Sequence, residues 1–348
     1  MRGNNKKSNH DKDLKRAYET GAFDEDRVEA QQRFSDKSKH FQQGKTARTQ
    51  QTRQQEATAD ASSLPRGEVI QVFSLFSEVL AGDVTYRCVQ RKTLARVSAT
   101  QIVVGDWVRF TPSPERNDAQ KFEGVIEAIE DRRTVLMRAD SFKAQLAHPI
   151  VANAEQMLIV ASIHLPEVKW GLIDRMVVAA RSGGLNPIVC LNKFDTVKDA
   201  VDAAEADAIL QHYQTLGVAS LRTSVVAKMG LEELHQLLIG RTTVLAGHSG
   251  VGKSSLVRAV EPALDLRVGE ISVVHNKGMH TTTSARRYIL AGGGFVVDTP
   301  GVKLFGLWNV TPESLIEYFP DVASGTAPPW RQQSYERILQ SITVPERA

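Results

Sequence analysis

The sequence predicts an α/β protein in which a parallel sheet follows a smaller β-rich region. Apolar runs at 156–161 and 242–246 alternate with segments of helical spacing such as 168–181, a pattern typical of parallel sheets covered on both faces. Short β-rich runs separated by turn residues occupy the preceding part of the chain. Polar and glycine-rich motifs follow the ends of the apolar strands, where open α/β sheets bind their ligands.

Length and composition limit the class of protein. A chain of 348 residues is long enough for two or three domains. Its two cysteines, Cys88 and Cys190, exclude a disulfide framework and suit a reducing compartment. No run approaches the roughly 18 apolar residues of a membrane span, and no apolar stretch follows the basic N-terminus as in a secretory signal. We therefore expect a cytoplasmic protein without a membrane partner.

Residues 1–66 differ in composition from the rest of the chain. They contain only six Leu, Ile, Val or Phe residues, too few for a packed core, so we expect a disordered extension. The segment has 14 Lys or Arg against 10 Asp or Glu, which gives a charge of +4. It is either a solvated tail or a basic arm that orders on a phosphate backbone. The candidate contacts lie in an acid-free stretch and are Lys37, Lys39, Lys45, Arg48 and Arg53.

Residues 67–148 form the predicted β-rich domain. Strands are expected at 68–79, 85–90, 106–111 and 124–129. About five short strands in so short a segment favour a small barrel, most simply an OB-fold. The alternative is any small β-barrel that serves as a spacer.

A P-loop pattern follows the predicted strand 242–246. Glycines at 247, 250 and 252 allow the close approach of main-chain amides to phosphate, Lys253 is expected on the β- and γ-phosphates, and the Ser254 hydroxyl on Mg²⁺. The alternative is a glycine-rich turn without a ligand. The predicted phosphate-binding residues are Gly247, His248, Ser249, Gly250, Val251, Gly252, Lys253, Ser254 and Ser255.

A guanine-recognition pattern, Asn192, Lys193, Phe194 and Asp195, follows the predicted strand 188–191. One carboxylate, that of Asp195, can accept both adjacent donors of guanine, and adenine lacks them, so the carboxylate discriminates between the bases. Asn192 is expected either to contact guanine O6 and N7 or to tie this loop to the P-loop. The Lys193 stem is expected over the base, and Ser224 on its far side.

Asp298 and Gly301 form a third, weaker pattern after the predicted strand 294–297. Asp298 is expected to hold Mg²⁺ through water, while the Gly301 amide reaches the γ-phosphate. A threonine of the preceding loop is expected to complete the metal shell. Spacing does not choose among Thr281, Thr282 and Thr283, and we favour Thr282.

Val302 stands where many GTPases place a glutamine that orients the attacking water. Because valine cannot orient water, another side chain must do so. The candidate is His280, in the phosphate-facing loop. The alternative is that His280 only stabilises the loop or contacts a partner.

The order of the motifs is unusual. The base-reading motif precedes the P-loop by 55 residues, from Asn192 to Gly247, whereas in the ordinary guanine-nucleotide-binding domain the P-loop comes first. The sequence therefore predicts that residues 149–304 are a circularly permuted P-loop GTPase domain.

This set of motifs resembles one family, the circularly permuted ribosomal GTPases called ribosome small-subunit-dependent GTPase A, over residues 67–320. The resemblance implies GTP as substrate with Mg²⁺, and slow hydrolysis stimulated by the small (30S) ribosomal subunit during its late maturation. It also implies an OB-fold that touches rRNA, a basic extension that assists binding, and His280 in catalysis. Other assembly factors are further partners to consider, and we expect a monomer.

The C-terminal region departs from the family pattern. Members carry a zinc subdomain with three cysteines and a histidine, but no cysteine or histidine follows His280 here. A structural zinc site needs four such ligands, so we predict that zinc is absent. Residues 305–348 are expected to form a shortened helical cap, with helices at 312–319 and 334–342 joined by 321–331.

Two other functions fit part of these motifs. A P-loop ATPase or small-molecule kinase predicts a preference for ATP, against which Asp195 argues. A nucleotide-dependent RNA-binding scaffold with negligible hydrolysis is supported by Val302.

Overall fold

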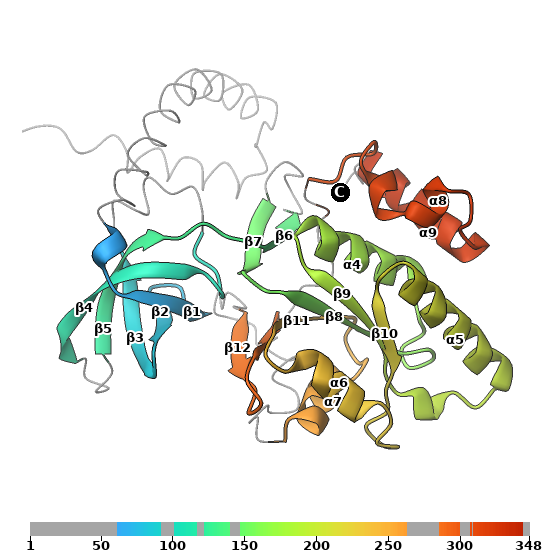
Figure 1. The fold of residues 1–348 in the computed structure, drawn as a ribbon, viewed down its shortest axis with the longest axis horizontal. Coiled ribbons are helices and arrows are strands. Elements are labelled where there is room, and N and C mark those ends of the chain that lie inside the picture. Colours follow the sequence, from blue (N-terminus) through green and yellow to red (C-terminus); the bar gives the residue numbers. More distant parts are fainter. Residues whose placement is uncertain are drawn as a thin grey trace, which may run out of the picture. The chain divides into compact units, whose positions relative to one another are not determined.

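The computed structural model describes residues 61–91, 101–116, 122–139, 147–262, 285–299, 307 and 309–343 (Figure 1). All the described residues belong to one compact unit, Asp60–Ala348. The predicted basic arm lies outside the described residues, and so does the segment that carries His280 and the three candidate threonines, including Thr282. Gly301 and Val302 also lie outside them.

A closed five-stranded barrel opens the described part of the chain, after the 3-10 helix η1 (Ala61–Ser63). Its strand order is β1-β2-β3-β5-β4, and pairing of β1 with β4 closes it. Alternate side chains point inward and pack together, among them Val69, Val79, Val108, Phe110 and Ile126. The barrel confirms the predicted OB-like domain. Its strands are β1 (Arg66–Val72), β2 (Ser77–Ala81), β3 (Val84–Gln90), β4 (Trp107–Arg116) and β5 (Phe122–Ile129).

The single run predicted at 68–79 is divided into β1 and β2. The Phe73 amide donates to the carbonyl oxygen of Phe76 at 2.8 Å, which closes a turn inside this run. The sequence pattern also missed a separate two-stranded sheet that follows the barrel, formed by β6 (Val135–Ala139) and β7 (Ala147–Ala152).

The second sheet region has the order β10-β9-β8-β11-β13-β12, and β12 continues into β1 of the barrel. From β10 to β13 neighbouring strands are parallel, whereas β12 is antiparallel to β13. This arrangement confirms the predicted parallel α/β sheet. The strands are β8 (Gln156–Ala161), β9 (Asn186–Leu191), β10 (Ala219–Arg222), β11 (Thr242–Ala246), β12 (Arg286–Ile289) and β13 (Phe295–Asp298).

Helices cover both faces of this sheet (Figure 1). Because side chains alternate along a strand, neighbouring residues enter different cores: Ile159 packs with α4 (Trp170–Ser182) and α5 (Ala200–Thr215), and Leu158 packs with α6 (Leu231–Leu238) and α7 (Lys253–Val260). Across the described ranges, no helix combines the length and apolar character needed to cross a bilayer.

The C-terminal cap consists of η3 (Leu315–Tyr318), α8 (Pro320–Ala323) and α9 (Pro329–Thr343). The expected connection at 321–331 is wrong in detail, because α8 extends into its start and α9 already begins at Pro329. Proline at the first position of each helix explains both starts, since its fixed φ suits a first turn. The cap is helical, as the sequence predicts, but the helix expected at 312–319 is only the 3-10 helix η3, whereas the helix expected at 334–342 lies within α9.

Buried charges hold the cap against the sheet domain. Arg331 of α9 is 1% exposed and contacts Asp174 of α4 and, from Nε at 3.2 Å, Asp321 of α8. The same carboxylates receive bonds from α5, since Tyr213 donates to Asp174 at 2.6 Å and His212 Nε2 lies 2.8 Å from Asp321. Four helices therefore meet at one buried ionic cluster.

Candidate nucleotide-binding site

The two principal motifs meet at one edge of the sheet although they lie far apart in the chain. The base-reading motif follows β9 and the P-loop follows β11, and β8 lies between these strands. Since all three strands are parallel, their carboxyl ends share an edge. Along the chain, β9 and its base-reading loop come before β11 and its P-loop. This order of the strands in the chain is the circular permutation that the motif order predicts.

The P-loop has a backbone that requires glycine. Gly247 has φ 131°, and a Cβ there would lie 2.1 Å from the carbonyl oxygen of Val160. Gly252 has φ 90°, and its Cβ would lie 2.6 Å from the Asn192 side-chain amide. The loop therefore runs against β8 on one side and the base-reading motif on the other.

Lys253 begins α7 directly after the P-loop. Its Nζ donates to the carbonyl oxygens of Gly247 at 2.8 Å and His248 at 3.0 Å, so the ammonium group curls back over the loop. Burial lowers the pKa of Lys253, and the charge of Asp298 opposes this shift. The free amides and the dipole at the start of α7, which includes Ser254 and Ser255, favour an anion at this place.

The base-reading loop is tied to the P-loop by two side chains. Asn192 is 2% exposed and donates from Nδ2 to the carbonyl oxygen of Val251 at 2.9 Å. The second is Lys193, whose Nζ donates to the carbonyl oxygens of Gly250 at 2.6 Å and Leu165 at 2.9 Å. The link to the P-loop, one of the two contacts expected for Asn192, is present in the structure.

Asp195 and Ser224 come together across the two loops that follow β9 and β10. The Ser224 hydroxyl donates to Asp195 Oδ1 at 2.5 Å and accepts from the Ala227 amide at 2.9 Å. Asp195 is half-buried and Ser224 fully buried. Phe194, between these polar groups and the core, is 8% exposed and packs beneath the loop. One carboxylate is thus fixed in orientation at the edge where a base would lie.

Thr223 belongs to the same arrangement, and the sequence interpretation missed it. Its hydroxyl donates to Asn192 Oδ1 at 3.1 Å, and the residue is completely buried. It therefore fixes the orientation in which the Asn192 amide faces the P-loop. Its position directly before Ser224 was the sequence signal that could have placed it at this site.

Asp298 ends β13 opposite Leu245 of β11 and is 3% exposed. Burial raises its pKa to about 6, although the nearby Lys253 charge acts in the opposite direction. A buried carboxylate beside the P-loop lysine is an oxygen donor of the kind that Mg²⁺ prefers. Together with the Ser254 hydroxyl it suits a magnesium ion chemically.

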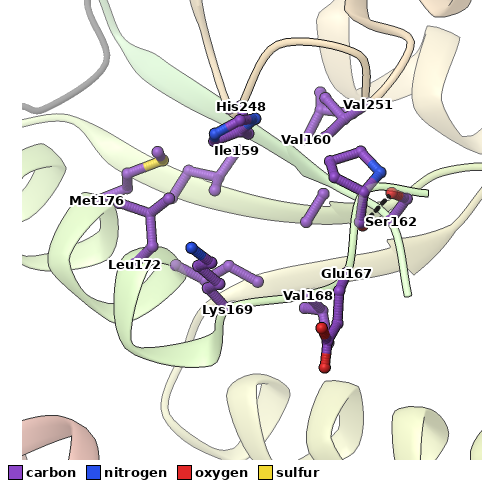
Figure 2. Close-up of a pocket in the computed structure, with 14 residues that line it drawn as sticks. Ile159, Val160, Ser162, Glu167, Val168, Lys169, Leu172, Met176, His248 and Val251 are labelled. Carbon is purple, nitrogen blue, oxygen red and sulfur yellow. Dashed lines mark hydrogen bonds between the residues drawn. The ribbon is translucent and has the colours of Figure 1, made fainter. Parts of the chain in front are cut away.

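A cavity of about 170 Å³ lies beside the P-loop (Figure 2). Most of its lining residues are apolar and come from β8, α4, the segment between them and the P-loop, while the polar members are Ser162, Glu167, Lys169 and His248. The bond between Ser162 and the carbonyl oxygen of Pro166, 2.8 Å long, shapes one side. Because the walls are mainly apolar, the cavity does not suit phosphate. His248 lines this cavity and Ser249 is exposed, so their expected phosphate contacts stay a prediction.

Comparison with known proteins decides the family. The family model described as RsgA GTPase matches residues 129–308. The chain belongs to the RsgA GTPase family. The small ribosomal subunit biogenesis GTPase RsgA of Proteus mirabilis is 35% identical over 306 residues, covering 80% of this chain and 84% of the relative. Its namesake from Photorhabdus laumondii is 39% identical over 256 residues, covering 73% and 70%.

Solved structures agree with this family. YjeQ from Thermotoga maritima is 28% identical with a TM-score of 0.62, over 80% of this chain and 98% of its own. YloQ, described as a circularly permuted GTPase, shares the fold with a TM-score of 0.61 at 24% identity, over 81% and 96%. The permuted GTPase fold predicted from the motif order is confirmed. As a member of the RsgA GTPase family, the chain is a GTP hydrolase.

The structure says less about metals. Within the described part of the chain, no group of three or more His, Cys, Asp or Glu side chains is placed to hold a metal ion. Residues outside that part include Thr282 and His280. The absence of zinc therefore stays a prediction from the sequence.

Proposed function

We propose that the protein binds the small (30S) ribosomal subunit in the cytoplasm and assists its late maturation, hydrolysing GTP slowly and with stimulation by the subunit. The observation that supports this most strongly is the joined site in a member of the RsgA GTPase family, where Asn192 links the base-reading loop to the P-loop. The relatives from Proteus and Photorhabdus are named for biogenesis of this subunit.

Base recognition is assigned to Asp195. With Oδ1 already accepting from Ser224, the carboxylate is held so that it can accept the N1–H and 2-amino donors of guanine. An adenine in the same place would leave the carboxylate unpaired, which disfavours ATP strongly. This argues against the ATPase or kinase alternative.

The phosphates are assigned to the P-loop amides from Gly247 to Ser255, with Lys253 on the β- and γ-phosphates. We assign Mg²⁺ to Ser254 and Asp298, with Thr282 as the proposed third residue. A bound Mg²⁺ would neutralise charge that develops on the phosphate oxygens during hydrolysis. Lys253 and the first turn of α7 orient the same phosphates, and Gly301 is proposed to reach the γ-phosphate.

His280 is the proposed group that positions the attacking water, because Val302 cannot do so. We expect His280→Ala to retain GTP binding and to lose most of the subunit-stimulated turnover. If that variant binds GTP and keeps its stimulated rate, His280 acts elsewhere.

The barrel offers groups suited to RNA. Phe73 and Phe76 stack with ring centroids 4.4 Å apart, and the Arg87 guanidinium lies over Phe76 at 3.8 Å. Leu75, in the same turn, is 83% exposed. Aromatic faces and arginine planes stack on unpaired bases, so we assign this turn, with the basic arm from Lys37 to Arg53, to rRNA contact by a monomeric protein. Other assembly factors are further proposed partners, because the proposed role in subunit maturation brings the protein into contact with them on the subunit.

The decisive experiment measures turnover of GTP, with ATP as control, with and without purified small subunits. We expect a slow basal GTP turnover, marked stimulation by the small subunit, little stimulation by the large subunit, and no ATP turnover. GTP binding without any turnover in the presence of small subunits would instead favour the nucleotide-dependent RNA scaffold.

A further inference from the structure

Strand β12 joins the barrel to the nucleotide-binding sheet. On one side it pairs with β13, where Arg286 lies opposite Asp298, and on the other it pairs with β1, where the same residue lies opposite Gln71. Neighbouring strands are about 4.8 Å apart. The barrel backbone at Gln71 therefore runs about 10 Å, or two strand spacings, from the backbone of the proposed magnesium ligand.

A buried ion pair crosses the same junction. Arg287 of β12 contacts Glu68 of β1, and their side chains are 3% and 12% exposed. The guanidinium also lies 3.1 Å from the ring centre of Phe295, the first residue of β13. Burial lowers the pKa of Arg287, while its hydrogen bond and charge interaction with Glu68 oppose the shift. One side chain thus contacts both the barrel and the strand that ends at Asp298.

Stability alone does not account for charges at this place. A buried arginine–glutamate pair is worth no more than a well-packed apolar pair of similar volume, because both charges lose their hydration. The attraction between the opposite charges, however, selects Glu68 as the partner of Arg287, whereas an apolar contact accepts any apolar neighbour. Glu68 lies opposite both Leu80 of β2 and Trp107 of β4, which is where β1 and β4 close the barrel. The contact with Glu68 therefore sets the position of Arg287 relative to the closed barrel.

We propose that Glu68 and Arg287 are positioning residues for the stimulated reaction: the pair holds β12 and β13 in a fixed relation to the barrel, so that binding of the small subunit by the barrel aligns the Asp298 end of the site. This inference rests on the proposed function. Displacement of a reacting group by about 1 Å can lower a rate by roughly 100-fold, so a small shift of β13 is sufficient. Basal turnover does not require the alignment.

The test uses the full chain with Glu68→Leu and Arg287→Met combined, which replaces both charges by apolar side chains and leaves neither partner unpaired. Circular dichroism and the melting temperature show whether the variant folds. We expect GTP affinity and basal turnover within about twofold of the wild type, and kcat at saturating small subunits roughly tenfold lower or more. The control is Glu130→Gln, which removes a partly exposed carboxylate that pairs with Arg66 and Arg109 within the barrel domain, away from β12. We expect its stimulated rate to be unchanged.

Three results would overturn the inference. The doubly apolar variant keeps the full stimulated kcat; or it only binds the subunit more weakly and recovers the full kcat at saturation; or basal and stimulated turnover fall together by the same factor. In each case wild-type protein is stimulated. Absence of stimulation in the wild type is a different outcome, because it rejects the proposed function itself.

Discussion

The side-chain amide of Asn192 donates a hydrogen bond of 2.9 Å to the carbonyl oxygen of Val251, 59 residues further along the chain. The bond joins the base-reading loop to the P-loop, and Gly252 next to it has no room for a side chain. The base end and the phosphate end of the site are therefore one rigid unit before a nucleotide binds. Such preorganisation lowers the entropy that binding must otherwise remove.

Replacing Asn192 by alanine is expected to weaken GTP and GDP binding alike. The change leaves the buried Val251 carbonyl oxygen without the Asn192 donor and the Thr223 hydroxyl without the Asn192 acceptor, although Thr223 retains its 3.2 Å contact with the Cys190 sulfur. A buried polar group left unpaired costs about 1–3 kcal/mol, which corresponds to roughly 10- to 100-fold in affinity. Titration with a fluorescent guanine nucleotide measures the loss. The control is Asn186→Ala, at the exposed start of β9, the strand that precedes Asn192; we expect wild-type affinity for it.

Asp195→Asn is expected to change which base is preferred. Ser224 fixes Oδ1 as an acceptor, so the new amide nitrogen takes the other position and opposes the 2-amino group of guanine. Xanthine carries an oxygen there, which accepts a hydrogen bond. GTP affinity should fall by about 100-fold or more, and XTP should bind the variant better than GTP. Competition binding of the two nucleotides provides the measurement, with Asp207→Asn on the exposed face of α5 as control.

The elements that the sequence predicted best are those whose signal is local. The strand predicted at 242–246 coincides with β11, because an apolar run followed by the three glycines of the P-loop is readable within a few residues. The motif order likewise depends only on position along the chain, so the permuted fold followed from it.

What the sequence did not indicate depends on partners distant in the chain. Arg287 and Arg331 look like ordinary surface residues of a strand and a helix, and their burial depends on Glu68 and Asp174, more than 150 residues away. The role of Thr223 depends in the same way on Asn192. Periodicity describes one element at a time, so ion pairs between elements and the joining of β12 to the barrel are outside what it can predict.

Asp298→Asn should make the nucleotide-free protein more stable while abolishing turnover. Burial raises the Asp298 pKa from 3.8 to about 6, so the folded state holds its proton more tightly than the unfolded state. The wild type consequently loses stability as pH rises from about 4 to about 6, and above that range the ionised carboxylate costs about 2–3 kcal/mol. Asparagine has no such loss. Urea unfolding at pH 4 and pH 8 measures the difference.

The expected difference in unfolding free energy between Asp298→Asn and the wild type depends on pH. The variant should exceed the wild type in stability at pH 8 and match it near pH 4, and Mg²⁺ with GTP should stabilise only the wild type. An equal stability of both proteins at pH 8 would show that the carboxylate is not destabilised by its burial.

Removal of divalent metals is expected to leave the nucleotide-free fold intact. No cysteine or histidine follows His280 in the sequence, and a structural zinc site needs four ligands of this kind. Elemental analysis of purified protein should find zinc well below one equivalent per chain. Dialysis against EDTA should leave the melting temperature unchanged, whereas a loss of helical signal on chelation would reveal a structural metal.

Arg331→Gln is expected to be the most destabilising of these substitutions. Arg331 is 1% exposed and lies between the carboxylates of Asp174 and Asp321. Glutamine leaves two buried carboxylates without their cation, a change that costs about 3–5 kcal/mol. The loss should appear as a lower urea midpoint and as earlier proteolysis of the cap. Arg337→Gln, on the exposed side of the same helix, should change the free energy of unfolding by no more than about 0.5 kcal/mol.

A second variant distinguishes the effect of unpaired buried charges from the effect of lost packing between the cap and the sheet domain. Combining Arg331→Met with Asp174→Leu and Asp321→Leu removes all three charges and keeps an apolar cluster, which should recover much of the lost stability. If Arg331→Gln unfolds no earlier than Arg337→Gln, the ionic cluster does not hold the cap. If instead the apolar triple variant is as unstable as Arg331→Gln, the bonds from Tyr213 and His212 to the two carboxylates carry the stability.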